Sequence, residues 1–195
     1  MPKIVDVDER RRQIANALWQ VADRDGLAAA SVRAVADQAG ISAGALRHYF
    51  PNQDDLLHFA MNTIDQHVRT RVAELEPDPD PVENALRLLM LTEPGDPAKD
   101  PEGTLGVRIW FAFSALAMTR PTLSKTLREA HLAVRGACEA AVHRIAPDHR
   151  DPEGAVDTLH ALVDGLALHG AHSPDLMPTS RIEELLRTQL RSLAG

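Results

Sequence analysis

Apolar residues in the first quarter of the chain recur at the spacing of short amphipathic helices. The first helical face carries Ile14, Leu18, Val21 and Ala22. Gly26 ends this helix, because glycine tolerates the backbone conformation of a helix terminus. Ser31 and Ser42 are suited to cap two further short helices, with a tight turn at Gly40 between them. Asn52 can cap a longer fourth helix.

The rest of the chain consists of periodic segments separated by short stretches rich in proline. Eleven of the thirteen prolines follow position 76, and none interrupts a periodic stretch, so they mark loops. The segments between them predict helices over residues 81–92, 104–119, 121–146, 153–172 and 179–193. Because no alternation of period two is found, we expect an all-α fold of about nine helices.

The composition fits a folded domain in a reducing compartment. The chain has 195 residues, of which 44% are hydrophobic and 25% charged, enough to bury a sizeable core. The single cysteine, Cys138, cannot form an internal disulfide. The first residues hold no apolar run of the secretory kind, and no run reaches the roughly 20 residues of a membrane span. We therefore expect a cytoplasmic protein without a membrane partner.

Charge is distributed unevenly along the chain. The formal net charge is −7. Residues 1–50 carry seven Lys and Arg against six Asp and Glu, which gives +1, and residues 51–195 therefore carry −8. A nearly neutral first segment on an acidic remainder allows a local basic patch, but it is not by itself a signal for nucleic acid.

The first fifty residues follow the plan of a helix-turn-helix. In that plan two short helices, joined by a glycine-containing turn and braced by a longer helix, place the second short helix in the DNA major groove. Small residues begin this helix and would let its backbone approach the duplex. Arginine can bond a guanine edge through two hydrogen bonds, while hydroxyls and helix N-termini suit phosphates. The candidate DNA contacts are Ser31, Arg33, Ser42, Ala43, Gly44, Ala45, Arg47, His48 and Tyr49.

Four segments together resemble the tetracycline-repressor (TetR) family of one-component regulators. They are SVRAVA at 31–36, AGISAG at 39–44, LRHYFP at 46–51 and DLL at 55–57. The resemblance implies a homodimer that binds a palindromic operator, most often as a repressor, and is released by a small-molecule ligand. It also implies a helix-turn-helix DNA-binding domain over 1–50 and a ligand-sensing and dimerisation domain over 51–195. The final helix pair, within 162–190, is similar to that of the branch containing the choline-responsive repressor.

Two positions depart from the family pattern. Arg47 stands where the family most often has tyrosine, and Gln53 stands where it usually has lysine. Gln53 is kept as a candidate DNA contact, although the loss of a lysine removes a phosphate partner. Arg47 can restore that charge or change which bases are read.

The sixth expected helix is apolar nearly all round, which indicates a central, buried position. Trp110 and Phe113 share one of its faces and could line an apolar ligand cavity, although ordinary core packing explains each residue equally well. Asp164, with Arg108 or His131, could fix a polar group of the ligand. The candidate ligand contacts are Met61, Met90, Arg108, Trp110, Phe113, Met118, His131 and Asp164.

The last two expected helices are more apolar than one side of a core requires. A symmetric helical interface between two copies of the chain is a natural way to cover the excess. The candidate interface residues are Leu159, Leu162, Leu166, His169, Gly170, Ile182, Leu186 and Leu190.

The sequence offers no established catalytic or metal-binding motif. It has no His-Glu-x-x-His, no Cys-x-x-Cys and no glycine-rich phosphate loop, although His169 and His172, three apart, could share a metal. We therefore expect a regulator without catalytic activity, metal or cofactor. Its expected partners are double-stranded operator DNA, a second copy of itself and a small-molecule effector. Two alternatives are a metal-binding or catalytic helical protein that retains the first domain, and a regulator controlled by a protein partner.

Overall fold

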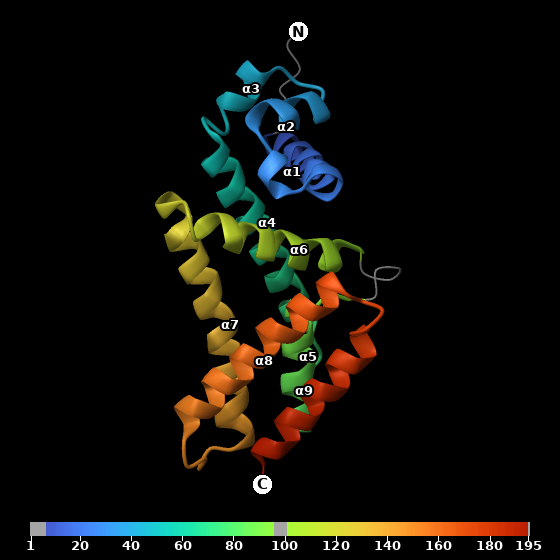
Figure 1. The fold of residues 1–195 in the computed structure, drawn as a ribbon, viewed down its shortest axis with the longest axis vertical. Helices are drawn as coiled ribbons and strands as arrows, with labels where there is room; N and C mark the ends of the chain where they lie inside the picture. Colours follow the sequence, from blue (N-terminus) through green and yellow to red (C-terminus); the bar gives the residue numbers. More distant parts are fainter. Residues whose placement is uncertain (1–6, 96–100, 195) are drawn as a thin grey trace. The chain divides into compact units, whose positions relative to one another are not determined.

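A computed structural model describes residues 7–95 and 101–194 of the chain. These ranges form α-helices and 3-10 turns without any strand, which confirms the all-α expectation (Figure 1). The nine α-helices are α1 Val7–Asp25, α2 Val32–Gln38, α3 Ala43–Arg47, α4 Gln53–Glu74, α5 Pro81–Leu89, α6 Pro101–Ala117, α7 Ser124–Ile145, α8 Pro152–His172 and α9 Thr179–Leu193. The 3-10 turns are η1 Leu27–Ala29, η2 Met90–Thr92 and η3 Pro121–Leu123.

The expected helix starts and the expected turn are confirmed. The side-chain oxygens of Ser31, Ser42 and Asn52 each accept a hydrogen bond from the backbone amide three residues later, over 3.0–3.2 Å. Each bond satisfies an amide that has no partner inside its own helix. Gly40 has a φ of 67°, the left-handed conformation that the turn between α2 and α3 requires.

Several helix boundaries differ from the sequence-based expectation. The short helix that Ser42 begins ends at Arg47, because the amides of Tyr49 and Phe50 both bond to the carbonyl of Leu46 and close the turn ahead of Pro51. Two of the expected helices are preceded or followed by a 3-10 turn: η2 follows α5, and η3 precedes α7. The sixth helix begins three residues earlier than expected, at a proline that is tolerated in a first turn.

The described residues divide into two compact units. Unit 1 comprises those within 1–66 and 109–127, and unit 2 comprises those within 67–108 and 128–195. Helices α4, α6 and α7 therefore contribute to both units. This division follows packing, so the functional division at residue 50 stays a prediction.

Unit 1 holds the helix-turn-helix and the start of α4 around one core. Its fully buried side chains include Ile14, Leu18, Leu46, Leu56, Leu57 and Phe113. Leu46 is the residue that fastens the short helix α3 to this core. The rings of Phe50 and Phe59 add a contact between the end of the helix-turn-helix and α4, with centroids 4.8 Å apart.

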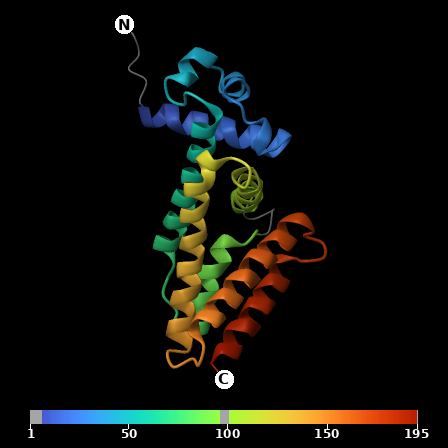
Figure 2. The same cartoon turned by 60° about the vertical axis from the view of Figure 1, so that its left-hand side comes forward.

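Unit 2 is a helical core built mainly from α5, α7, α8 and α9. Helices α8 and α9 form an antiparallel hairpin that is visible in both views (Figure 1, Figure 2). Gly170 permits this close packing, since a Cβ there would lie 2.6 Å from Ile182 and 2.7 Å from Pro94. Arg187 ties α9 to α5 through two hydrogen bonds to Glu83, of 2.9 and 3.2 Å.

Most residues of the expected dimer interface lie in the core of unit 2. Gly170 and five of the expected interface leucines and isoleucines are buried inside unit 2: Leu159, Leu166, Ile182, Leu186 and Leu190. A side chain buried within its own chain offers no surface to a partner. Most apolar side chains of these two helices thus pack inside the core of unit 2. Of the expected interface residues, only Leu162 and His169 retain exposed surface.

Among the helices of the two described ranges, none combines the length and apolarity that crossing a membrane requires.

Candidate nucleic-acid interface

The N-terminal turn of α3 is open to solvent. Ser42, Gly44 and Ala45 are exposed and Ala43 is half-buried, whereas Leu46 is fully buried. The helix is thus held from below while its small side chains face outward. The amide of Ala45 already donates to the Ser42 oxygen, whereas the amides of Ala43 and Gly44 begin the helix, where a phosphate oxygen can be bound. This arrangement allows the close backbone approach that a major-groove helix needs.

Arg47, His48 and Tyr49 follow at the other end of α3, and all three are exposed. Tyr49 keeps 40% of its surface, so it is not part of the core. Arg47 has no ion-pair partner within the described ranges, which leaves its guanidinium available to a base edge or a phosphate.

Ser31 and Arg33 lie at the start of α2. The Ser31 oxygen accepts the capping bond described above, and its hydroxyl hydrogen can still be donated to a phosphate. Arg33 is 87% exposed and approaches Asp37 at only 4.0 Å. An exposed pair of this kind contributes little, so Arg33 can leave it for a phosphate.

Gln53 is engaged inside unit 1 at both ends of its amide. Its Nε2 donates to the carbonyls of Ala28 at 3.1 Å and Ala30 at 3.5 Å, and its Oε1 accepts from Arg120 at 3.3 Å. These bonds give Gln53 a bracing role that explains its presence without DNA. Its expected contact with DNA is untested.

Sequence reasoning missed the network that continues from Gln53. Arg120 also approaches the carboxylate of Asp54 at 3.3 Å, and the hydroxyl of Thr122 donates to that carboxylate at 2.6 Å. The network fastens the first turn of α4 to the segment around η3. It joins two segments that lie more than 60 positions apart in the chain, so no local pattern could have indicated it.

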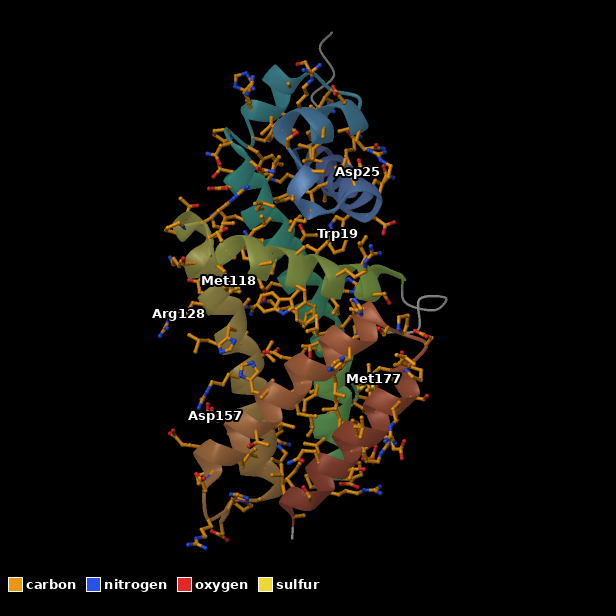
Figure 3. The ribbon with its side chains drawn as sticks, in the orientation of Figure 1. Trp19, Asp25, Met118, Arg128, Asp157 and Met177 are labelled. Atoms are coloured by element: carbon orange, nitrogen blue, oxygen red, sulfur yellow. The ribbon has the colours of Figure 1, made fainter. Side chains whose placement is uncertain are left out.

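The candidate ligand contacts are divided between the two units. In unit 1, Met61 and Phe113 are buried and Trp110 is half-buried. Met118, labelled in Figure 3 at the end of α6, is 82% exposed, so burial gives no support to its expected role as a lining residue. In unit 2, Arg108 and His131 are exposed, and Met90 and Asp164 are half-buried.

Glu93, which follows η2, is a buried carboxyl that the sequence analysis did not single out. Only 2% of its surface is exposed, and neither carboxylate oxygen has a hydrogen-bond partner in the part of the chain that the structure describes. Burial is the main cause that raises the pKa of Glu93 to about 9, and the negative charge of Asp164 adds to the effect. The residue lies in a proline-rich segment that reads as an exposed loop, which is why burial was not expected.

The structure brings His131 and Asp164 together, as the sequence analysis proposed for a polar ligand group, and adds His160. The His131 and His160 rings have centroids 4.4 Å apart, and His160 Nε2 lies 3.7 Å from a carboxylate oxygen of Asp164. His160 is 6% exposed, and this burial lowers its pKa against the opposing effect of Asp164.

Two family descriptions match the chain. Residues 14–59 match bacterial regulatory proteins of the tetR family, and residues 97–195 match the C-terminal part of the BetI-type transcriptional repressors. The HTH-type transcriptional regulator PksA of Bacillus subtilis is 33% identical over 196 residues, an alignment that covers 99% of this chain and 94% of PksA. BetI of Stenotrophomonas maltophilia is 32% identical over 172 residues, covering 88% of this chain and 86% of BetI.

Solved structures share the fold. A transcriptional regulator from Rhodococcus sp. Rha1 is 32% identical with a TM-score of 0.82, and the match covers 94% of this chain and 95% of that one. A transcriptional regulator from Saccharomonospora viridis, solved in complex with choline, has a TM-score of 0.74 at 20% identity, with 94% and 96% covered. The second likeness concerns the fold alone.

Proposed function

The chain belongs to the TetR family of bacterial transcriptional regulators, and from this premise we propose that it represses transcription as a homodimer on a palindromic operator, which it releases when a small molecule binds. Its relatives are DNA-binding regulators and not enzymes. It acts in the cytoplasm, where its operator lies. The DNA-binding domain is formed by residues 1–50, and the remainder senses the ligand and dimerises.

The observation that carries this proposal is the open N-terminal turn of α3. This turn exposes the small residues Ser42, Gly44 and Ala45, whereas Leu46 is buried in the core. The exposed guanidinium of Arg47 follows directly. Small outward side chains on a helix fastened by one buried leucine have no evident packing role. They suit a helix whose backbone must come close to another molecule, and a duplex is the partner that this motif serves.

Ala45→Glu tests the assignment of this surface. A glutamate there would set a negative charge against the phosphates while leaving the core untouched, so we expect operator affinity to fall at least tenfold. Ala133→Glu, at an exposed position of α7, adds the same charge elsewhere and should bind DNA as the original chain does. Equal operator affinity of the two variants, measured by fluorescence anisotropy at one salt concentration, would contradict the assignment.

Dimerisation is proposed to use the outer face of α8, which we call the α8 stripe. It is defined by Thr158, Ala161, Leu162, Gly165, Leu168, His169 and His172, which recur three or four positions apart and are exposed or half-buried. Leu168 is 47% exposed. A Cβ at Gly165 would meet nothing within 4 Å, so the chain's own packing does not require this glycine. Close approach by a second helix would explain it.

The effector is proposed to carry a positive charge. Glu93 supports this, because a buried carboxyl without a partner gains more from a cation than from a neutral ligand. The excess of acidic residues after position 50 favours the same sign. Choline, which the Saccharomonospora viridis regulator holds, is the first compound to titrate.

A further inference from the structure

Three potential metal ligands meet between α7 and α8 in unit 2. His131 lies on α7, and His160 and Asp164 lie one turn apart on α8, so the latter two share a helical face. One donor atom from each of the three residues lies within 4.8 Å of the other two donors. His160 Nε2 lies 3.7 Å from Asp164 Oδ2.

His160 provides a second and independent indication. Its side chain is 93% buried, and its Nε2 has no hydrogen-bond partner within the described residues. Buried polar atoms are nearly always satisfied, so an unpaired ring nitrogen needs an explanation. This nitrogen faces the Asp164 carboxylate at a distance too long for a hydrogen bond and suitable for a shared ion.

We propose that His131, His160 and Asp164 bind a divalent transition-metal ion with the ligand preferences of zinc. Two imidazoles and one carboxylate form a known three-ligand zinc set, in which a fourth position stays open. Zinc bonds of 2.0–2.2 Å place the donors of a tetrahedral site about 3.3 Å apart. Small side-chain rotations would bring the 3.7 Å pair to that spacing, and exposed His131 is free to follow.

The surroundings are compatible with a cation. Arg135, one turn beyond His131, would repel a metal ion, but it is paired with Asp157 at 3.1 Å. Figure 3 labels Asp157 on α8. A metal held by one residue of α7 and two of α8 would join these helices. Since such a site exists only in the folded chain, metal binding would raise thermal stability.

The test uses the full chain without an affinity tag, stripped of metal with a chelator and dialysed. Zn²⁺ is titrated by calorimetry, and Co²⁺ is added separately to report coordination geometry by visible absorption. We expect one equivalent per chain, and a loss of affinity of at least tenfold in His131→Ala and Asp164→Asn. His143→Ala is the matched control, because His143 is exposed on the same helix and its ring bonds the carbonyl of Glu139, away from the proposed ligands.

Thermal unfolding gives a second readout. Zn²⁺ should raise the melting temperature of the original chain and of His143→Ala, but not of His131→Ala or Asp164→Asn. His131→Ala and Asp164→Asn change side chains that keep exposed surface. They therefore test the site even if the buried variant His160→Ala fails to fold. The proposal is overturned if the original chain binds no stoichiometric Zn²⁺. It is also overturned if His131→Ala and Asp164→Asn both bind Zn²⁺ as tightly as the original chain does. That result would assign the metal to other histidines, such as His169 and His172.

Discussion

At the scale of single residues, we propose that Arg47 reads the DNA sequence. It replaces the usual tyrosine of the family, and its guanidinium is exposed at the end of α3. If it bonds a guanine edge, Arg47→Ala should relax the base preference at one position of each half-site, by ~1–3 kcal/mol. The measurement is binding to a set of operators that vary at single positions.

Arg33→Ala is the matched control for Arg47→Ala. Arg33 is also exposed but lies at the start of α2, where a phosphate contact is expected, so its removal should weaken binding to all operators by a similar factor. Uniform weakening by Arg47→Ala as well would show that Arg47 also contacts phosphate.

From the burial of Glu93 we predict an unusual pH dependence of the free energy of unfolding. Its pKa is raised in the folded chain, to about 9, above the ordinary value of 4.5. The folded chain therefore keeps a proton that the unfolded chain releases, and the free energy of unfolding should fall as pH rises from 4.5 towards 9. Glu93→Gln should remove this slope and stabilise the protein at pH 8 by roughly 2–4 kcal/mol.

Chemical denaturation of both proteins between pH 5 and 9 checks the Glu93 prediction. An identical pH slope in Glu93→Gln and the original chain would contradict it. The variant also tests the cationic effector, because choline should lower operator affinity of the original chain and have a much smaller effect on Glu93→Gln.

Features that depend on neighbouring residues could be predicted from the sequence. The burial of a side chain by distant segments could not. Ser31, Ser42 and Gly40 were predicted because a cap and a left-handed turn depend on residues within three positions. The burial of Glu93 could not be predicted, since the adjoining Pro94 packs beside Gly170 and accepts a hydrogen bond from Thr179, both far later in the chain.

At the scale of elements, the proposed dimer depends on the outer face of α8. Gly165→Arg would place a long charged side chain in the centre of the α8 stripe, at a position where a Cβ would meet no other atom within 4 Å. We expect the dissociation constant of the dimer to rise at least a hundredfold while helicity and melting behaviour stay those of a folded chain. Analytical ultracentrifugation at micromolar concentration measures this.

Gly136→Arg provides the matched control for the α8 stripe. Gly136 is an exposed glycine of α7 with the same open space around a Cβ, so the substitution carries the same change in helix propensity and charge. It should leave the dimer intact. A Gly165→Arg protein that remains dimeric would contradict the assignment of this face.

Helix positions were largely predictable, but the partners of each helix were not. Periodicity showed that α8 and α9 are strongly apolar, yet an apolar face can be covered by the same chain or by another. The structure assigns Leu166 and Ile182 to the core. The bonds among Gln53, Asp54 and Arg120, which fasten α4, were equally inaccessible because they join segments far apart in the sequence.

At the scale of the whole molecule, regulation requires that DNA and effector favour different states. An effector can lower operator affinity only by the factor by which it binds more tightly to the state that does not bind DNA. Operator DNA must then lower effector affinity by the same factor. Couplings of ~1–3 kcal/mol are usual for such systems and are sufficient here.

Recovery and footprinting of the genomic DNA that the purified protein binds test the central claim most directly. A dimer that reads DNA with two copies of α3 should protect two inverted half-sites whose centres lie roughly 34–36 Å apart, one turn of B-DNA, or a multiple of that distance. Protection of such a palindrome, lost in Ala45→Glu, is the predicted result. Recovery of no specific sequence, or of a single unpaired site, would contradict the account.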